Sequence, residues 1–370
     1  MSGTLKTART STAEPPAART QLLKRRPISP GPGFVPLPPP RSAAPYRHAL
    51  ADVLGRQQLT TIRRSEALRF HCVGDTGGWR DGRPQCEVAN AMVSDLDSDT
   101  PVHFFYHLGD VVYPHGEEAH YGPQFFAPYR DYDAPIFAIP GNHDGEAPVE
   151  AGTSPLEPFL RAFCSPSQPL HDAALRVRRP AAAQPHVHWT LVHERLWIIG
   201  LYTNVPEDGQ VEESQLEWLT GELRAAPLKA RVILAMHRPV YSIDVVHGSN
   251  LDLGDALDVC FDRAGRVPDA VVGAHAHAYQ RFTRHVGDRQ VPYVVVGSGG
   301  FHERHAAGTG VPDLPATFPG LEGVRLEAHQ AEAHGYLTVT VTPSHAEAVY
   351  RTVSGDGALA YDRFVIPGPA

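Results

Sequence analysis

The chain has 370 residues, of which 42% are hydrophobic, and a formal net charge of −8. This length and apolar content suffice for a large core, in one large domain or two ordinary ones. Residues 1–48 hold eight Lys or Arg and one Glu, a balance of +7, which leaves −15 on the rest. A part of the chain this acidic is a poor non-specific nucleic-acid binder, and an anionic substrate would need a local positive charge such as bound metal ions.

No run of sequence approaches the ~18 apolar residues that cross a bilayer, and no apolar region follows the basic residues near the start, so no secretory signal is visible. We therefore expect a cytoplasmic protein. The four cysteines, Cys72, Cys86, Cys164 and Cys260, form no C-x-x-C pair. In a reducing cytoplasm we expect thiols, with a Cys72–Cys86 bridge left open.

Residues 1–48 also contain ten of the 35 prolines, and the run PISPGPGFVPLPPP excludes a helix or a central strand. We interpret 1–48 as a disordered Pro/Arg-rich arm and 49–370 as the globular part.

From residue 49 onward, short apolar runs end in glycine-rich turns and predict buried strands. In chain order these runs are LRFHCVGD, HFFYHLGD, PIFAIPGNHD, RLWIIGLYT, RVILAMH, AVVGAHAH and YVVVGSGG. Between them, EESQLEWLTGELRAA and LDLGDALDVCFDRAG predict helices, the first with Leu216, Leu219 and Leu223 on one face. The segment from Phe301 to about Ala333 lacks periodicity and predicts a long loop, whereas YLTVTVT and AEAVYRTV alternate and predict a hairpin. The pattern indicates an α/β core with some antiparallel sheet.

Five of the predicted strands end in polar side chains: Asp75; Asp110 and Tyr113; Asn142 and His143; His237; His275 and His277. Ligands in α/β folds gather outside the carboxyl ends of strands, and carboxylates with imidazoles suit Fe, Mn or Zn. In a regular strand His275 and His277 would share one face, and each would reach a different ion of a close pair. Taken singly, a strand histidine is more often a satisfied core residue.

In this order, GD-x-G, GD-x-x-Y, GNHD, an apolar run closing on His and H-x-H resemble the metallophosphoesterase (calcineurin-like) superfamily, from about Leu68 to the end of the chain. The resemblance implies a four-layer α/β/β/α sandwich and makes 49–370 a metallophosphoesterase catalytic domain. Most of that superfamily opens with D-x-H, but here Gly77 stands at the histidine position and Tyr113 follows Asp110 by three residues.

That pairing is similar to the purple acid phosphatases, whose ferric ion takes a tyrosinate ligand. VGDTGGW, LGDVVY, AMHRPVYSI and VVVGSGG resemble the short, single-domain members, and the sequence ahead of Leu68 leaves no room for a separate N-terminal β domain. Two departures from the family pattern are Ala274, where glycine is usual, and GNHD in place of GNHE.

By this resemblance Asp75, Tyr113 and His277 hold Fe(III), Asp110 bridges both metals, and Asn142, His237 and His275 hold a divalent ion of Fe, Zn or Mn. His143 and His247 would face the substrate, His143 steadying the phosphoryl oxygens or protonating the leaving group. Of the remaining residues, Asp144 orients His143 or caps the turn, Arg281 forms a structural ion pair, and His302 and His305 line the mouth of the site.

The implied activity is hydrolysis of phosphomonoesters by in-line attack of a metal-bound hydroxide. The same site would serve a phosphodiesterase or a phosphoprotein phosphatase. A non-catalytic binding scaffold is the alternative of another class; loss of several ligands would mark it, and all seven ligand positions are filled. The expected partners are a small phosphate ester or a phosphoprotein, with no nucleic acid and no membrane.

Overall fold

The computed structural model describes residues 37–40, 43–146, 155–164, 183–203, 211–307, 313–318 and 320–368. Most of the predicted arm lies outside these residues, so its disorder stays a prediction. The described part of the arm contacts the domain: the N–H of Leu37 lies 3.0 Å from Glu212 Oε1, and Trp218 Nε1 donates to the carbonyl of Pro45 at 2.8 Å. Arg47 and His48 already belong to a strand, which pairs with residues 190–192.

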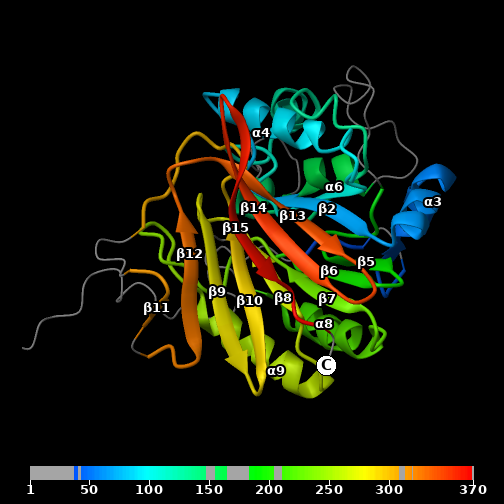
Figure 1. Ribbon diagram of the computed structural model, residues 1–370, viewed down its shortest axis with the longest axis vertical. Helices are drawn as coiled ribbons and strands as arrows, with labels where there is room; N and C mark the ends of the chain where they lie inside the picture. Colours follow the sequence, from blue (N-terminus) through cyan, green and yellow to red (C-terminus); the bar gives the residue numbers. More distant parts are fainter. Residues whose placement is uncertain are drawn as a thin grey trace, which may run out of the picture.

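Two β-sheets form the centre of the molecule (Figure 1). Sheet A has nine strands in the order β1 (Arg47–Ala49), β5 (Trp189–His193), β6 (Leu196–Gly200), β7 (Arg231–Ala235), β8 (Ala270–Gly273), β10 (Arg289–Val296), β9 (Tyr279–Val286), β12 (Val324–Gln330) and β11 (Ala316–Thr317). Sheet B has six in the order β15 (Gly357–Val365), β14 (Ala346–Ser354), β13 (Gly335–Val341), β2 (Leu68–Val73), β3 (Phe104–His107) and β4 (Ile136–Ala138).

Helices cover the outer faces of the two sheets. α8 (Glu213–Ala225) and α9 (Leu251–Ala264) lie against sheet A, and α4 (Arg83–Ser94) and α6 (Glu157–Phe163) lie on the side of sheet B (Figure 1). The other described helices are α3 (Arg56–Ser65) and the short α2 (Leu50–Val53), α5 (Asn142–Gly145), the 3₁₀ turn Glu118–His120 and the π turn Gly122–Phe126.

Strand β7 shows how the layers pack. Its side chains Val232 and Leu234 join the core under α8 and α9, whereas Ile233 and Ala235 join the core shared with sheet B. A strand covered on both faces is apolar throughout rather than alternating, as RVILA is. The predicted four-layer α/β/β/α sandwich is therefore confirmed.

Several predicted elements are confirmed, among them α8, α9 and the hairpin β13–β14. α9 begins at an Asn250 side chain that accepts from Leu253 N, and it ends at Gly265 in the left-handed conformation. The prediction of a long loop from Phe301 to Ala333 is wrong, since β12 lies in it and pairs with β9. Charged residues alternate with the buried ones along β12, which hid the strand among glycines and prolines.

Neither a disulfide nor a membrane span stabilises the described part of the chain. Cys72 is buried and Cys86 is exposed, and all four cysteines are free, so the Cys72–Cys86 bridge is not formed. None of the described helices is both long enough and apolar enough to cross a membrane.

Candidate metal centre

The candidate ligands lie where strands of both sheets end. β2, β3 and β4 run parallel in sheet B, and β7 and β8 run parallel in sheet A. Their carboxyl ends meet because the N–H of Gly74, just past β2, donates to the carbonyl of Val296 at the end of β10 at 2.9 Å. The loops after β2, β3 and β4 therefore face the loops after β7 and β8.

Three of the candidate ligands have left-handed backbones: Asp75 (φ 55°), Asp110 (φ 53°) and His275 (φ 68°). Such values are uncommon for residues other than glycine and occur where the surroundings hold the chain. Here the N–H of His275 donates to Asp75 Oδ2 at 2.7 Å. β8 ends at Gly273, so the expectation that His275 and His277 lie in a regular strand is wrong. The chain bends at His275 and sends the two imidazoles to different parts of the site.

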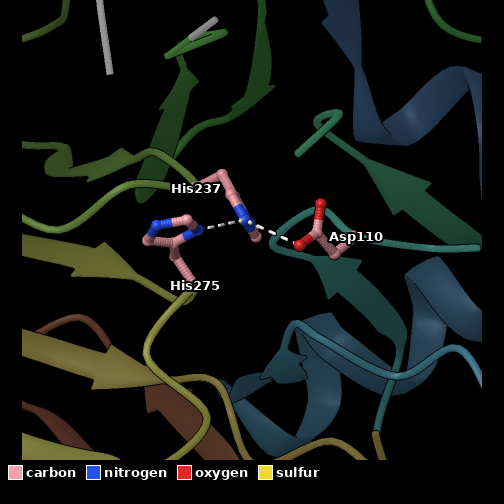
Figure 2. Close-up of side chains that lie close together, drawn as sticks. All are labelled: Asp110, His237 and His275. Carbon is pink, nitrogen blue, oxygen red and sulfur yellow. Dashed lines mark hydrogen bonds and ion pairs between the residues drawn. The ribbon is translucent and has the colours of Figure 1, made fainter. Parts of the chain in front are cut away.

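Asp110, His237 and His275 form the tighter cluster, with one candidate ligand atom from each within 4.8 Å of the others (Figure 2). His237 Nε2 lies 3.1 Å from Asp110 Oδ2 and 3.3 Å from His275 Nδ1. Asn142 joins the cluster, since its Oδ1 lies 3.1 Å from His237 Nε2 and 3.0 Å from His275 Nδ1.

Asp75, Tyr113 and His277 form a second group beside the first. The phenolic oxygen of Tyr113 lies 3.2 Å from Asp75 Oδ1 and 3.3 Å from His277 Nε2. It also lies 3.2 Å from Asp110 Oδ2, the same oxygen that His237 approaches. All seven predicted ligands thus come together, and Asp110 stands between the two groups. Their roles as ligands remain predictions.

The hydrogen bonds of His237 and His277 orient these two imidazoles as metal ligands need to be oriented. His237 Nδ1 donates to the carbonyl of Leu108 at 2.9 Å, and His277 Nδ1 donates to the carbonyl of Glu303 at 2.6 Å. Each Nε2 lone pair therefore points into the site, as a metal ligand requires. Ligand atoms bound ~2.1 Å from one ion lie ~3 Å apart at right angles, which matches the distances here.

The charges of the site also suit a cation. Burial by itself lowers the pKa of His237, but the carboxylates of Asp110 and Asp75 raise it to about 9. Burial raises the pKa of Tyr113 well above its usual value, and Asp110 and Asp75 raise it further. In the protein without metal these groups hold protons that a cation would replace.

His143 follows Asn142 in α5 and is not part of either group. Its N–H donates to Asp110 Oδ1 at 2.9 Å, and its Nδ1 donates to the carbonyl of Pro114 at 2.6 Å. The side chain is 31% exposed, and Glu146 Oε2 lies 3.6 Å from Nδ1. A partly exposed ring that is bonded to the chain through Nδ1 fits the predicted substrate-facing role.

His247 lies against the first group, with its ring centroid 3.8 Å from that of His275. Its N–H donates at 2.9 Å to the buried Asp244, whose other oxygen pairs with His305 Nδ1 at 3.2 Å. The ring of His305 in turn stacks on His277 at 4.0 Å. His305 therefore lies at the site, as expected, and Asp244 is a contributor that the sequence did not reveal.

Asp144 caps the turn after β4 rather than orienting His143. Its carboxylate accepts from the backbone N–H groups of Gly141 (2.9 Å), Val111 (3.0 Å) and Val112 (3.3 Å). Burial and the nearby Asp110 raise its pKa to about 7. The predicted ion pair of Arg281 is confirmed, with Asp362 at 2.6 Å.

Two further residues at the site escaped the sequence analysis. Arg238 is buried, and its Nη1 donates to His275 Nε2 at 2.8 Å. Phe301 stacks on Tyr113 with ring centroids 4.0 Å apart. Arg238 could have been suspected because it directly follows the candidate ligand His237. Phe301 could have been suspected because the two glycines before it allow the chain to approach the site closely.

Comparison with known proteins defines the class. A family model described as calcineurin-like phosphoesterase matches residues 68–279, more than half of the chain. The chain therefore belongs to the calcineurin-like phosphoesterase family, a class of metal-dependent phosphoric ester hydrolases.

Purple acid phosphatases are among the proteins to which the chain is similar. Purple acid phosphatase 22 of Arabidopsis thaliana is 30% identical over 125 residues, which are 32% of this chain and 27% of that protein. The solved structure of purple acid phosphatase PPD1 from yellow lupin (Lupinus luteus) has a TM-score of 0.59 at 17% identity, covering 81% of this chain and 53% of that one. The chain thus spans about half of the lupin protein.

Two other solved structures share the fold. GAP50 of Plasmodium, described as the anchor in the inner membrane complex, has a TM-score of 0.58 at 15% identity over 82% of this chain and 89% of its own. A dimetal phosphatase from Danio rerio has a TM-score of 0.50 at 10% identity over 82% of this chain and 99% of its own.

Proposed function

We propose that this protein is a binuclear-metal phosphatase, similar to the purple acid phosphatases, that hydrolyses phosphomonoesters. The observation that carries the proposal is the phenolic oxygen of Tyr113, which lies 3.2 Å from Asp75 Oδ1 and 3.2 Å from Asp110 Oδ2. Three oxygens that all carry negative charge once deprotonated suit a highly charged cation such as Fe(III), and the family membership supports a metal-dependent ester hydrolase.

The residues divide between two ions. Asp75, Tyr113 and His277 would hold the ferric ion, and Asn142, His237 and His275 would hold the divalent one. Asp110 would serve both, because its Oδ2 lies 3.2 Å from Tyr113 and 3.1 Å from His237. When bound, two such cations supply a nucleophile at neutral pH and neutralise the charge of the phosphoryl group.

His143 is suited to hold the proton for the leaving group at Nε2. Its Nδ1 is bonded to the carbonyl of Pro114, which fixes the ring and leaves Nε2 for the substrate. Burial lowers the pKa of His143, but Asp110 and Glu146 outweigh it, so the imidazole stays cationic to a higher pH than usual. His247, whose ring lies beside that of His275, is the other side chain suited to contact the ester.

The proposed substrate is a small phosphate monoester, with a phosphoprotein or a diester as the alternatives on the same site. The purified protein would be assayed on a chromogenic monoester, a chromogenic diester and a phosphopeptide, with iron and zinc measured in the same sample. Monoester turnover that exceeds diester turnover supports the proposal. A metal-loaded protein that turns over none of the three would instead support a non-catalytic scaffold.

Colour separates the iron assignment from a general di-metal centre. A tyrosinate–Fe(III) pair gives a visible charge-transfer band, and Tyr113→Phe should abolish that band. Tyr106→Phe is the matched control, because Tyr106 is a fully buried tyrosine whose hydroxyl has no hydrogen-bond partner among the described residues. A colourless, active protein whose Tyr113→Phe variant keeps its metals would refute the iron assignment.

A further inference from the structure

Phe301 is the aromatic side chain most closely stacked on the proposed tyrosinate. Its ring centroid lies 4.0 Å from that of Tyr113, with 27° between the ring planes, and 4.7 Å from that of His277. It thus touches two of the three side chains that would hold the ferric ion. It has no polar side-chain atom, so it ligates nothing itself.

The sequence before Phe301 explains how the ring comes to lie there. Gly299 and Gly300 bring the chain so close to its neighbours that side chains would not fit: a Cβ at Gly299 would overlap the carbonyl oxygen of Gly74, and one at Gly300 would overlap the backbone of Gln85. Gly300 also has φ +132°, which favours glycine. The N–H of Phe301 then donates to the carbonyl of Asp75 at 3.0 Å.

Burial indicates what the stacked ring does for its neighbour. Tyr113 is 1% exposed, whereas Phe301, which is stacked on it, is partly exposed. The Tyr113 ring also contacts His143 at a centroid distance of 4.4 Å. The phenolic oxygen lies on the axis of the χ2 torsion, so its place depends on χ1. Rings packed against Tyr113 at these distances restrict a swing about χ1 and so hold the oxygen in place.

We infer that Phe301 is a positioning residue, which excludes water from the Tyr113 ring and holds the phenolic oxygen between Asp75 and Asp110. Its effect on the metal rests on the proposed function, since it needs Tyr113 to be an iron ligand. Its effect on Tyr113 does not, because the stacking is a contact between the two rings alone.

The test compares Phe301→Leu, which removes the stacked ring and keeps an apolar side chain, with Phe301→Tyr, which keeps the ring. Phe318→Leu is the matched control for general loosening of the core, since Phe318 is buried in the other hydrophobic cluster. One measurement is the position and intensity of the visible band per iron. The other is nitration of Tyr113 by tetranitromethane in the full chain, before and after chelation, read by peptide mass spectrometry.

We expect Phe301→Leu to shift and weaken the band and to nitrate Tyr113 several-fold faster, while Phe301→Tyr and Phe318→Leu resemble the wild type. A band and a nitration rate that Phe301→Leu leaves unchanged, at equal iron content, would overturn the inference and leave the proposed function intact. A colourless wild type whose Tyr113 is nitrated faster only in Phe301→Leu would refute the iron assignment and retain the positioning role.

Discussion

The ring of Tyr113 fills the space that a side chain at position 77 would need. A Cβ atom at residue 77 would lie 2.7 Å from Cδ2 of Tyr113 and 2.6 Å from Gln124 Oε1, closer than real Cβ contacts. A side chain at position 77 and an aromatic ring at position 113 therefore exclude each other. This gives a physical reason why D-x-G accompanies GD-x-x-Y in this chain. Most of the superfamily has a histidine at the position of Gly77.

Gly77→Ala should displace the Tyr113 ring. The added methyl has backbone and ring atoms within 3.0 Å, so we expect a loss of about 1–3 kcal/mol in the free energy of unfolding. The visible band should weaken at the same time. Gly82→Ala is the control, because a Cβ there meets nothing closer than 3.8 Å. Chemical denaturation and absorption spectra measure both effects, and a fully coloured, fully stable Gly77→Ala protein would contradict the shared space.

Glu146→Gln should move the alkaline limb of the activity profile to lower pH. Burial lowers the pKa of His143, while Asp110 and Glu146 raise it above 6.5. A raised pKa keeps the imidazole cationic, and activity that needs the cation is lost as pH rises through that pKa. Removing Glu146 removes one raising charge. The profile of kcat against pH measures the shift, and Glu213→Gln on α8 serves as the distant control.

Metal binding should strengthen with pH up to about 9. The pKa of His237 is raised to about 9 by Asp110, so the proton must leave before Nε2 binds a metal. In the metal-free protein the stabilising charge of His237 is fully present below pH ~6.5, the ordinary histidine value, and is lost as pH rises through about 9.

Denaturation of the chelated protein between pH ~6.5 and about 9 measures the loss of stability. Competition with a chelator measures the affinity of the site for metal. His237→Ala should remove this part of the pH dependence, whereas His285→Ala, an exposed histidine on β9, should keep it. Stability of the metal-free wild type that does not fall over this range would contradict the pairing of His237 with Asp110.

Asp144→Ala should be among the most destabilising single changes near the site. It leaves the N–H groups of Gly141, Val111 and Val112 without their carboxylate acceptor, and a buried unpaired donor costs about 1–3 kcal/mol. We expect a loss of at least about 3 kcal/mol, measured by denaturant unfolding. Asp131→Ala, at a 70% exposed side chain, should change stability by less than about 0.5 kcal/mol.

The strand ends were predictable because their signal is local. An apolar run followed by Gly-Asp, as at Asp75 and Asp110, specifies both a buried strand and a sharp turn that exposes the carboxylate. The parallel arrangement of β2, β3 and β4 then follows from the connections between them. The rest of the candidate ligand set came from the resemblance of the ordered motifs to the family, and the structure brings these candidate residues together.

Contacts between distant segments were not predictable in this way. Phe301 reaches Tyr113 only because the two sheets bring residues 77, 113 and 301 together, and no local pattern encodes that approach. The bend at His275 was missed for a different reason. The H-x-H spacing fits a strand equally well, and the left-handed backbone at His275 is held by Asp75, two hundred residues earlier in the chain.

Strand β2 (Leu68–Val73) leads into Asp75 and has β3 on one side and β13 on the other. β13 lies near the C-terminus, so the ribosome synthesises it late. Until residues 335–341 are synthesised and pair with β2, one edge of β2 stays unpaired. The run LRFHCV is apolar enough for an unpaired edge to invite other chains. We therefore expect truncations ahead of β13 to aggregate rather than to yield a smaller enzyme.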